Sequence, residues 1–489
     1  MEKKETLRII NIILISVVFI LGFQILFGQE KKENNSTNTV KKEEVIRKDI
    51  PSSKEIGEVI NVETPLYKAE ISTVNGKLLS INIKKYNAQL VSEFSKKLGI
   101  FPLMTISVDK ELSKELVNLK LSPSLKNVVV KDTPVKLTLR GKLKDGREFV
   151  KELTFYPNSY KIDVKTKLKN ADLITIVGPD IKVNEVHTSR MGHIGPVVET
   201  AERVERLEVK DITTPIRFSN VIWAGEEDKY FLLALKGKDF VVSIDNVEGH
   251  SIVKGFLGNA TFFGGPKELT QLESLGMENA IDYGAFGFLA KPFLKFFLFL
   301  HRFIPNWGLV IIVLTILIKI IFHPLTHKSF ESMKKMQELA PKLEEIKKKY
   351  KDNPQKFQEE TMKLYREAGV NPMGGCLPIL IQIPIFFALY EIFLNAVELK
   401  GASFLWISDL SIPDPTYAMP ILMGASMILQ QKLTPTTNPQ QEKIFMIMAV
   451  IFTFLFASFP AGLVLYWLTN NIITAVQNFI INKKLQGSS

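Results

Sequence analysis

A lysine lies within an apolar stretch that is long enough to cross a membrane. The stretch, WGLVIIVLTILIKIIFHPLTHK, covers residues 307–328, and Lys319 comes twelve residues after Trp307. At 1.5 Å per residue, this distance is about 18 Å along a helix. Because an ammonium ion costs roughly 2.5–3.5 kcal/mol at the centre of a bilayer on insertion scales, it requires water or a polar partner. Thr315 and His323 share its helix face, which predicts a polar cavity within the membrane.

Later apolar stretches carry polar residues at a similar depth. Gln382 comes six residues after the start of CLPILIQIPIFFALYEIFLNAVEL, near the expected level of Lys319. In LVLYWLTNNIITAVQNFII a polar stripe recurs at helical spacing, formed by Tyr466, Asn470, Thr474 and Gln477. Two simpler arrangements fit the same pattern. Lys319 could extend its stem to the near interface without any cavity, and the amides could be packing contacts between helices, worth about 1 kcal/mol each.

The composition indicates a membrane protein that crosses the bilayer several times. The 489 residues are 46% hydrophobic, and several apolar runs reach about 20 residues, the length of a spanning helix. Lysine and arginine number 62, against 51 aspartate and glutamate residues. This excess fits cytoplasmic loops and a membrane surface better than nucleic acid. Cys376 is the sole cysteine, so no internal disulfide can form.

We predict six spans, with both termini in the cytoplasm. Residues 1–28 form a retained anchor, because no small-x-small cleavage site follows the apolar run and the start of the chain is basic. A solvated linker follows at 29–56. The second span is 307–328, and the third to sixth spans with their short loops occupy 370–485.

Residues 57–285 are predicted to form a large all-β sandwich on the outer side. Runs such as VKLTLRGKL, EFVKELTFY and YKIDVKTKL alternate apolar and polar positions between Gly, Asn, Asp and Pro. The region carries no metal-spaced His/Cys cluster, GxSxG elbow, HExxH or phosphate loop. We therefore predict no metal, no cofactor and no enzymatic activity.

An amphipathic helix is predicted at 286–306, between this domain and the second span. Lys291, Lys295 and Arg302 fall near one side, and phenylalanine and leucine fill the other. This pattern is typical of a helix that lies in the outer interface, and Pro305 favours a break before the next span.

A charged segment at 329–369 is predicted to be a cytoplasmic helical hairpin. One apolar stripe steps by three and four residues through Met336, Leu339, Leu343, Ile346 and Tyr350. Asp352, Asn353 and Pro354 break the pattern before a second helix. The exposed stripe predicts contact with lipid headgroups or with a partner.

Long ordered motifs in this chain resemble the YidC/Oxa/Alb family of membrane-protein insertases. The run from NWGLVIIVLTILIKIIFHPLTHK through GVNPMGGCLPILIQIPIFFALY, then FLWISDLSIPDP, QQKLTP and FPAGLVLYWLTNN, carries the resemblance from about residue 286 onward. VNGKLLSINIKKY and WAGEEDKYFLLAL are similar to the large periplasmic domain of the Gram-negative-type members. The resemblance implies a β-supersandwich, similar to sugar-mutarotase folds, attached to a helical insertase core in the bacterial inner membrane.

The resemblance also implies a function and a site. Insertases of this family hold a hydrophilic groove that is open to cytoplasm and lipid and closed outside. The family's groove arginine falls on Lys319, which keeps the charge but lacks the bidentate fork. By the same alignment Thr315, Gln382, Tyr466 and Trp467 match groove positions, and Asn470 joins them from the polar stripe. The implied partners are nascent membrane proteins, the ribosome, the Sec translocon and the phospholipid bilayer, with no other nucleic acid.

Two functions of other classes compete with this interpretation. A small-solute transporter would also use an intramembrane lysine, but it predicts inverted repeats and interrupted helices, which are not evident in the sequence. A membrane enzyme would require paired carboxylates, HExxH or a Ser/Lys dyad in the spans, and none is found there.

Overall fold

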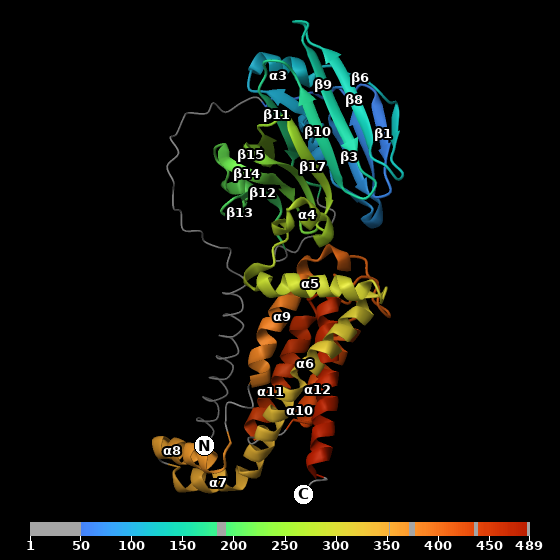
Figure 1. Cartoon of the computed structure of the whole chain (residues 1–489). Helices are drawn as coiled ribbons and strands as arrows, with labels where there is room; N and C mark the ends of the chain where they lie inside the picture. Colours follow the sequence, from blue (N-terminus) through green and yellow to red (C-terminus); the bar gives the residue numbers. More distant parts are fainter. Residues whose placement is uncertain (1–49, 183–191, 352, 371–376, 435–438, 487–489) are drawn as a thin grey trace.

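The computed structural model describes residues 50–182, 192–351, 353–370, 377–434 and 439–486. The predicted anchor at 1–28, most of the linker at 29–56 and the turn at 371–376 lie outside the described residues. The rest of the chain forms a β domain above a bundle of helices (Figure 1).

The β domain consists of two sheets and short helices. The five-stranded sheet has the order β4 (Ala88–Gln89), β3 (Leu78–Ile83), β2 (Tyr67–Ser72), β1 (Val59–Glu63) and β7 (Asn127–Val129). The main path of the twelve-stranded sheet is β13 (Val204–Arg206), β12 (Gly195–Thr200), β14 (Ile216–Glu227), β15 (Phe231–Val247), β17 (Asn259–Pro266), β10 (Lys161–Lys167), β9 (Glu148–Phe155), β8 (Val135–Lys142) and β6 (Ser122–Pro123). From β15 the sheet branches through β16 (His250–Gly255), β11 (Leu173–Pro179) and β5 (Thr105–Ser107). The helices are α2 (Glu93–Leu98), α3 (Lys110–Val117) and α4 (Leu269–Leu275).

Alternating side chains explain why these segments form strands. Along β9, Phe149, Leu153 and Phe155 are fully buried, and the residues beside them in the strand are not. The antiparallel neighbour β8 places Leu137 opposite Leu153, so both strands direct the same face into the core. The predicted all-β sandwich is confirmed.

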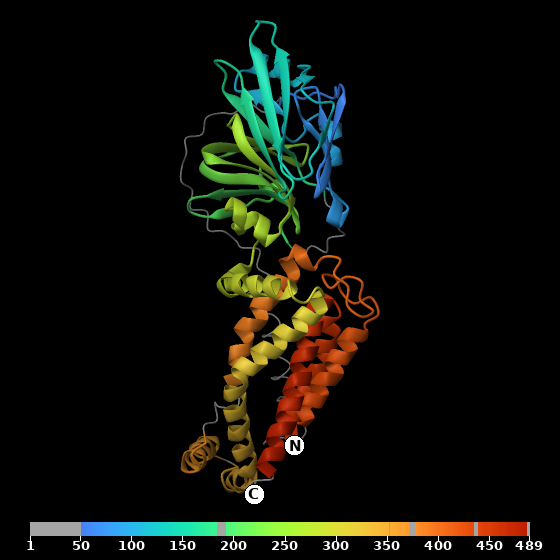
Figure 2. The ribbon, with the colours of Figure 1, turned by 45° about the vertical axis from the view of Figure 1, so that its right-hand side comes forward.

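The helical part contains the second to sixth predicted spans. They are α6 (Trp307–Glu338), α9 (Leu377–Asn395), α10 (Ala418–Lys432), α11 (Pro439–Phe456) and α12 (Ala461–Gln486), which run along one bundle (Figure 2). By length and apolar composition, two described stretches could cross a membrane, namely Gly284–His301 and Trp307–Glu338. The number of spans stays a prediction.

The first of these stretches contains α5 (Gly287–His301), which lies across the end of the bundle instead of along it (Figure 1). Its basic residues face the β domain, because Lys295 pairs with Glu273 at 2.8 Å and Lys291 donates to Asn279 at 2.9 Å. Phe288 is 75% exposed on this helix. This orientation supports the predicted interfacial helix.

The segment predicted to form a cytoplasmic hairpin differs from its prediction in one respect. The helix expected to end at residue 328 continues through Pro324 to Glu338, so Met336 lies on α6 and not on a hairpin arm. The hairpin consists of α7 (Ala340–Lys349) and α8 (Pro354–Glu367). The other four residues of the predicted stripe are half-buried, namely Leu339, Leu343, Ile346 and Tyr350.

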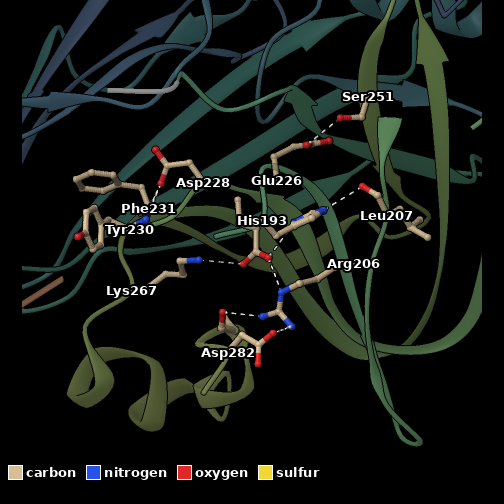
Figure 3. Close-up of polar contacts among 12 residues, drawn as sticks. His193, Arg206, Leu207, Glu226, Asp228, Tyr230, Phe231, Ser251, Lys267 and Asp282 are labelled. Carbon is tan, nitrogen blue, oxygen red and sulfur yellow. Dashed lines mark hydrogen bonds and ion pairs between the residues drawn. The ribbon is translucent and has the colours of Figure 1, made fainter. Parts of the chain in front are cut away.

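A buried ionic network lies where β14 ends (Figure 3). Glu227, with a side chain 1% exposed, lies 3.1 Å from His193 Nδ1, 2.7 Å from Arg206 Nε and 3.1 Å from Lys267 Nζ. Burial raises the pKa of Glu227, but Lys267, His193 and Arg206 oppose it more strongly and hold this pKa at about 2. Its neighbour Glu226 accepts a hydrogen bond from Ser251, and burial raises the pKa of Glu226 well above its usual range.

Hydrogen bonds connect this network to the helices. Arg206 Nη2 donates to the carbonyl of Ala280 at 3.0 Å, and Asn395 at the end of α9 donates to the carbonyl of Asp282 at 2.8 Å. The backbone N–H of Leu269 donates to the buried carboxylate of Glu398 at 3.1 Å. The β domain is therefore attached to the bundle by contacts from both sides of the junction.

The network gives a prediction for two adjacent glutamates. Glu227→Gln should lower the free energy of unfolding by about 3–5 kcal/mol at neutral pH, because it leaves buried cations without their anion. Glu226→Gln should leave this free energy unchanged or raised, because burial already disfavours the charged form of this carboxyl. Denaturant unfolding of the purified protein, followed by the fluorescence of buried Trp223, measures both changes.

The pH dependence has opposite signs at the two positions. The folded pKa of Glu227 lies below its ordinary value of 4.5, so its stabilisation is complete above that pH and is lost as the pH falls towards 2. The folded pKa of Glu226 is raised, so its contribution is present at low pH and is lost as the pH rises. Equal effects of the two substitutions would contradict the assignment.

Candidate functional site

Lys319 meets the predicted polar stripe on α12. Its Nζ donates a hydrogen bond to Thr474 Oγ1 at 2.8 Å, and Thr474 Oγ1 in turn donates to the carbonyl of Asn470 at 2.7 Å. Among the described residues, no carboxylate forms an ion pair with Lys319. The ammonium group is therefore held by a neutral partner and keeps its net charge available.

This contact bears on the depth of the charge. Thr474 is thirteen residues from Ala461, the first residue of α12, which corresponds to about 20 Å along the axis. Lys319 is about 18 Å from the start of α6 by the same measure. The side chain thus extends sideways to the neighbouring helix at its own level, which argues against snorkelling to the interface.

A second polar contact joins α9 to the same stripe. Gln382 Nε2 donates to the hydroxyl of Tyr466, which is 1% exposed. Between α6 and α9 lies a cavity of about 30 Å³, lined by Lys319, Gln382, Thr326 and apolar side chains. This volume suffices for a water molecule. The structure therefore brings Lys319 and Gln382 to one pocket.

The stripe also contacts α6 one turn further along. Gln477 Nε2 lies 3.3 Å from His323 Nδ1, at an exposed position. His323 and Gln477 thus continue the pairing of Lys319 with Thr474 towards the hairpin. Together with the contact of Gln382 and Tyr466, these pairs form a polar seam between α6, α9 and α12.

Other predicted site residues lie elsewhere in the packing. Thr315 is 1% exposed, and its hydroxyl donates to the carbonyl of Ile311 in its own helix. Trp467 packs against Phe386 with ring centroids 5.0 Å apart, within an aromatic cluster. Asn470 is half-buried on α12, beside the seam. None of these contacts links Thr315 or Trp467 directly to Lys319.

Two site features were not anticipated from the sequence. The direct partner of Lys319 is Thr474, whereas the sequence placed Thr474 only within a general stripe. Thr326 lines the pocket although its position near the end of the apolar run gave no such signal.

A wider cleft of about 1230 Å³ lies among turns of the β domain, with Asp145 and Lys169 in its lining. It belongs to a different part of the fold from the pocket beside Lys319.

Comparisons with known proteins cover both parts of the structure. A family model described as the 60Kd inner membrane protein matches residues 299–488, and one described as the YidC periplasmic domain matches residues 59–241 and 253–296. The membrane protein insertase YidC of Geobacter metallireducens is 35% identical over 539 residues, covering 99% of each chain. This chain belongs to the YidC family of membrane protein insertases.

Other YidC relatives agree with this assignment. The insertase of Syntrophus aciditrophicus is 39% identical over 476 residues, covering 87% of this chain and 85% of the relative. The insertase of Campylobacter jejuni is 34% identical, and the match covers 97% of this chain and 96% of the relative. A crystal structure described as an active YidC insertase with the first transmembrane domain resolved is 21% identical, with a TM-score of 0.40 over 86% of this chain and 94% of that one. The assignment rests on the sequences and not on this overall similarity.

The family assignment confirms the resemblance and the fold class predicted from the sequence. YidC proteins reside in the inner membrane and carry a periplasmic domain, which is the β domain here. YidC insertases are not enzymes. The alternative of a small-solute transporter finds no support in these comparisons.

The lateral contact of Lys319 can be measured by a double-mutant cycle. Lys319→Met and Thr474→Val should show a coupling energy of about 0.6 kcal/mol and at most about 1.7 kcal/mol, the mean and the maximum found for hydrogen bonds between membrane helices. Reversible unfolding in mixed micelles supplies the free energies. Thr469→Val is the matched control, because the Thr469 hydroxyl donates only to the carbonyl of Leu465 in its own helix. No coupling with Thr474 would favour a snorkelling lysine.

Proposed function

We propose that this YidC protein inserts nascent membrane proteins by receiving their polar extramembrane tails at the seam between α6, α9 and α12. The seam combines the ammonium of Lys319, the amide of Gln382 and the hydroxyls of Thr474 and Tyr466. These groups replace part of the hydration that a polar tail loses on entering the bilayer. The observation that carries the proposal is a charged lysine inside the bundle with a neutral partner.

The positive charge of Lys319 should give the seam a preference for acidic client tails. Opposite charges 4 Å apart attract by about 4 kcal/mol at an effective dielectric constant of about 20. A client carboxylate near Lys319 would gain an interaction of this kind, since no carboxylate within the described residues already pairs with this lysine. Acidic tails should therefore benefit most from the seam.

Insertion then proceeds without a chemical step. Once the tail occupies the seam, the apolar part of the client moves between helices into lipid and is stabilised by its own burial. The hydrophobic barrier for the tail is shortened, so no nucleotide hydrolysis is required. Lys319 acts here as a point charge, because its ammonium cannot provide the bidentate geometry of an arginine.

The orientation and the remaining partners are part of the same proposal. The basic N-terminus and the lysine-rich hairpin favour a cytoplasmic location for both chain ends and for α7 and α8. A nascent client would then arrive from the ribosome on the hairpin side. Cooperation with the Sec translocon is proposed from the family resemblance alone.

Substitution of Lys319 tests whether charge is what matters. Lys319→Arg should retain insertion, and Lys319→Gln should impair clients with Asp/Glu tails more than matched clients with Asn/Gln tails. Lys319→Glu should impair the acidic client further, because like charges repel by several kcal/mol at low effective dielectric. Insertion of both clients into proteoliposomes by each variant measures this. Normal insertion of the acidic client by Lys319→Glu would refute electrostatic capture.

The hairpin should be the more mobile element of the helical part. Among the described residues of α7 and α8, none is fully buried, whereas α6 buries residues such as Val310 and Leu314. Amide hydrogen exchange at 340–367 should therefore be faster than in α6. Equal protection in both segments would exclude a moving entry element on the hairpin side.

A further inference from the structure

The loop between α9 and α10, residues 400–417, covers the end of the bundle nearest the β domain (Figure 2). We call it the outer loop. It reaches the first residues of α12, because the N–H groups of Ala461 and Gly462 donate to the carbonyls of Ile412 and Leu410, at 2.8 and 2.9 Å. The loop thus supplies acceptors for helix-end donors that have no partner within α12.

The outer loop also reaches the start of α6. Phe404 packs so closely on Gly308 that a Cβ at this glycine would lie 2.1 Å from the phenylalanine ring. Asn306 Nδ2 donates to the carbonyl of Ser403 at 3.4 Å. Only glycine therefore permits this approach of loop and helix.

Asp414 holds the outer loop in this position. The residue is 1% exposed. Oδ1 accepts from the N–H and the hydroxyl of Thr416 at 3.0 and 2.7 Å, and Oδ2 accepts from Met419 N at 2.8 Å and from Trp406 Nε1 at 3.3 Å. One side chain thus ties the middle of the loop, its end and the first turn of α10.

The first turn of α10 explains why an anion is needed here. Its N-cap position is Tyr417, which has φ of 59° and provides no side-chain cap. A helix start without a cap leaves N–H donors unpaired and presents a partial positive charge. The carboxylate of Asp414 supplies the missing acceptor to Met419 and compensates the charge.

We propose that Asp414 is a positioning residue that keeps the outer loop closed over the periplasmic end of the polar seam. The proposal rests on the proposed seam, because a seal has a function only if the bundle holds a polar route. With the loop in place, the seam around Lys319 is separated from the periplasm by Leu410, Phe404 and the helix starts that they contact. A client tail can then enter from one side while ions cannot cross freely.

Asp414→Asn tests this role with little change in shape. An amide nitrogen cannot accept hydrogen bonds, so either rotamer of asparagine loses two of the contacts and places a donor against donors. Asp409→Asn is the matched control in the same loop, because Asp409 accepts a described hydrogen bond only from the nearby N–H of Ser411, at 2.8 Å. Both variants are prepared as the full chain and reconstituted in liposomes.

Two measurements distinguish a sealing role of Asp414 from a purely local structural role. Amide exchange at Ala461 and Gly462 should rise roughly tenfold in Asp414→Asn and stay unchanged in Asp409→Asn, since a lost charged hydrogen bond corresponds to about that factor. These amides do not touch Asp414, so a merely local role would leave them protected. Efflux of trapped carboxyfluorescein should rise by a similar factor in Asp414→Asn alone.

The outcomes are distinguishable. Unchanged exchange and unchanged efflux in a folded Asp414→Asn protein would overturn the proposal. Faster exchange without faster dye efflux would refute the sealing role of Asp414. The proposed function is tested separately, by the dependence of insertion on Lys319 with the acidic and amide clients. If Asp414→Asn does not fold, Trp406→Phe removes one donor to the carboxylate. Exchange and efflux equal to those of Asp409→Asn would then refute the proposal.

Discussion

The solvation of one half-buried ammonium group, that of Lys319, constrains the arrangement of the helical bundle. A lysine about 18 Å into α6 cannot face hydrocarbon without a large free-energy cost, so the face that carries it must pack against polar groups. The hydroxyl of Thr474 provides the contact, and the same helix provides Tyr466 to Gln382 of α9. Because both partners come from α12, this helix becomes the meeting point of α6 and α9.

The β domain is integrated with this bundle and is not merely tethered to it. One continuous hydrophobic core contains Leu233 and Leu272 of the β domain, Leu294 of α5 and Phe393 of α9. Hydrogen bonds of Asn395 and Glu398 cross the junction as well. A continuous apolar interface of this kind limits independent domain motion, so α5 is held in place from both sides.

The two ends of the bundle differ in how firmly they are packed. Near the β domain, the outer loop binds the starts of α10 and α12 through buried backbone contacts and Asp414. At the opposite end, α6 extends to Glu338, and the hairpin that follows has no fully buried residue among those with described burial. Stability is therefore unevenly distributed, with the weaker packing on the hairpin side. The difference is consistent with the proposed arrival of clients on the hairpin side.

Local patterns along the chain were enough to predict the class of protein and the β-sandwich, and they placed the polar residues on particular helices. These features follow from run length, strict alternation and helical spacing. The choice of partners depends on tertiary packing: Thr315 and Lys319 share one face, yet only Lys319 reaches α12, while Trp467 turns to an aromatic cluster. Periodicity fixes a helix face but not the rotation and crossing of its neighbours. Asp414 could not be singled out at all, because an irregular loop has no period and its contacts exist only once distant helix starts converge.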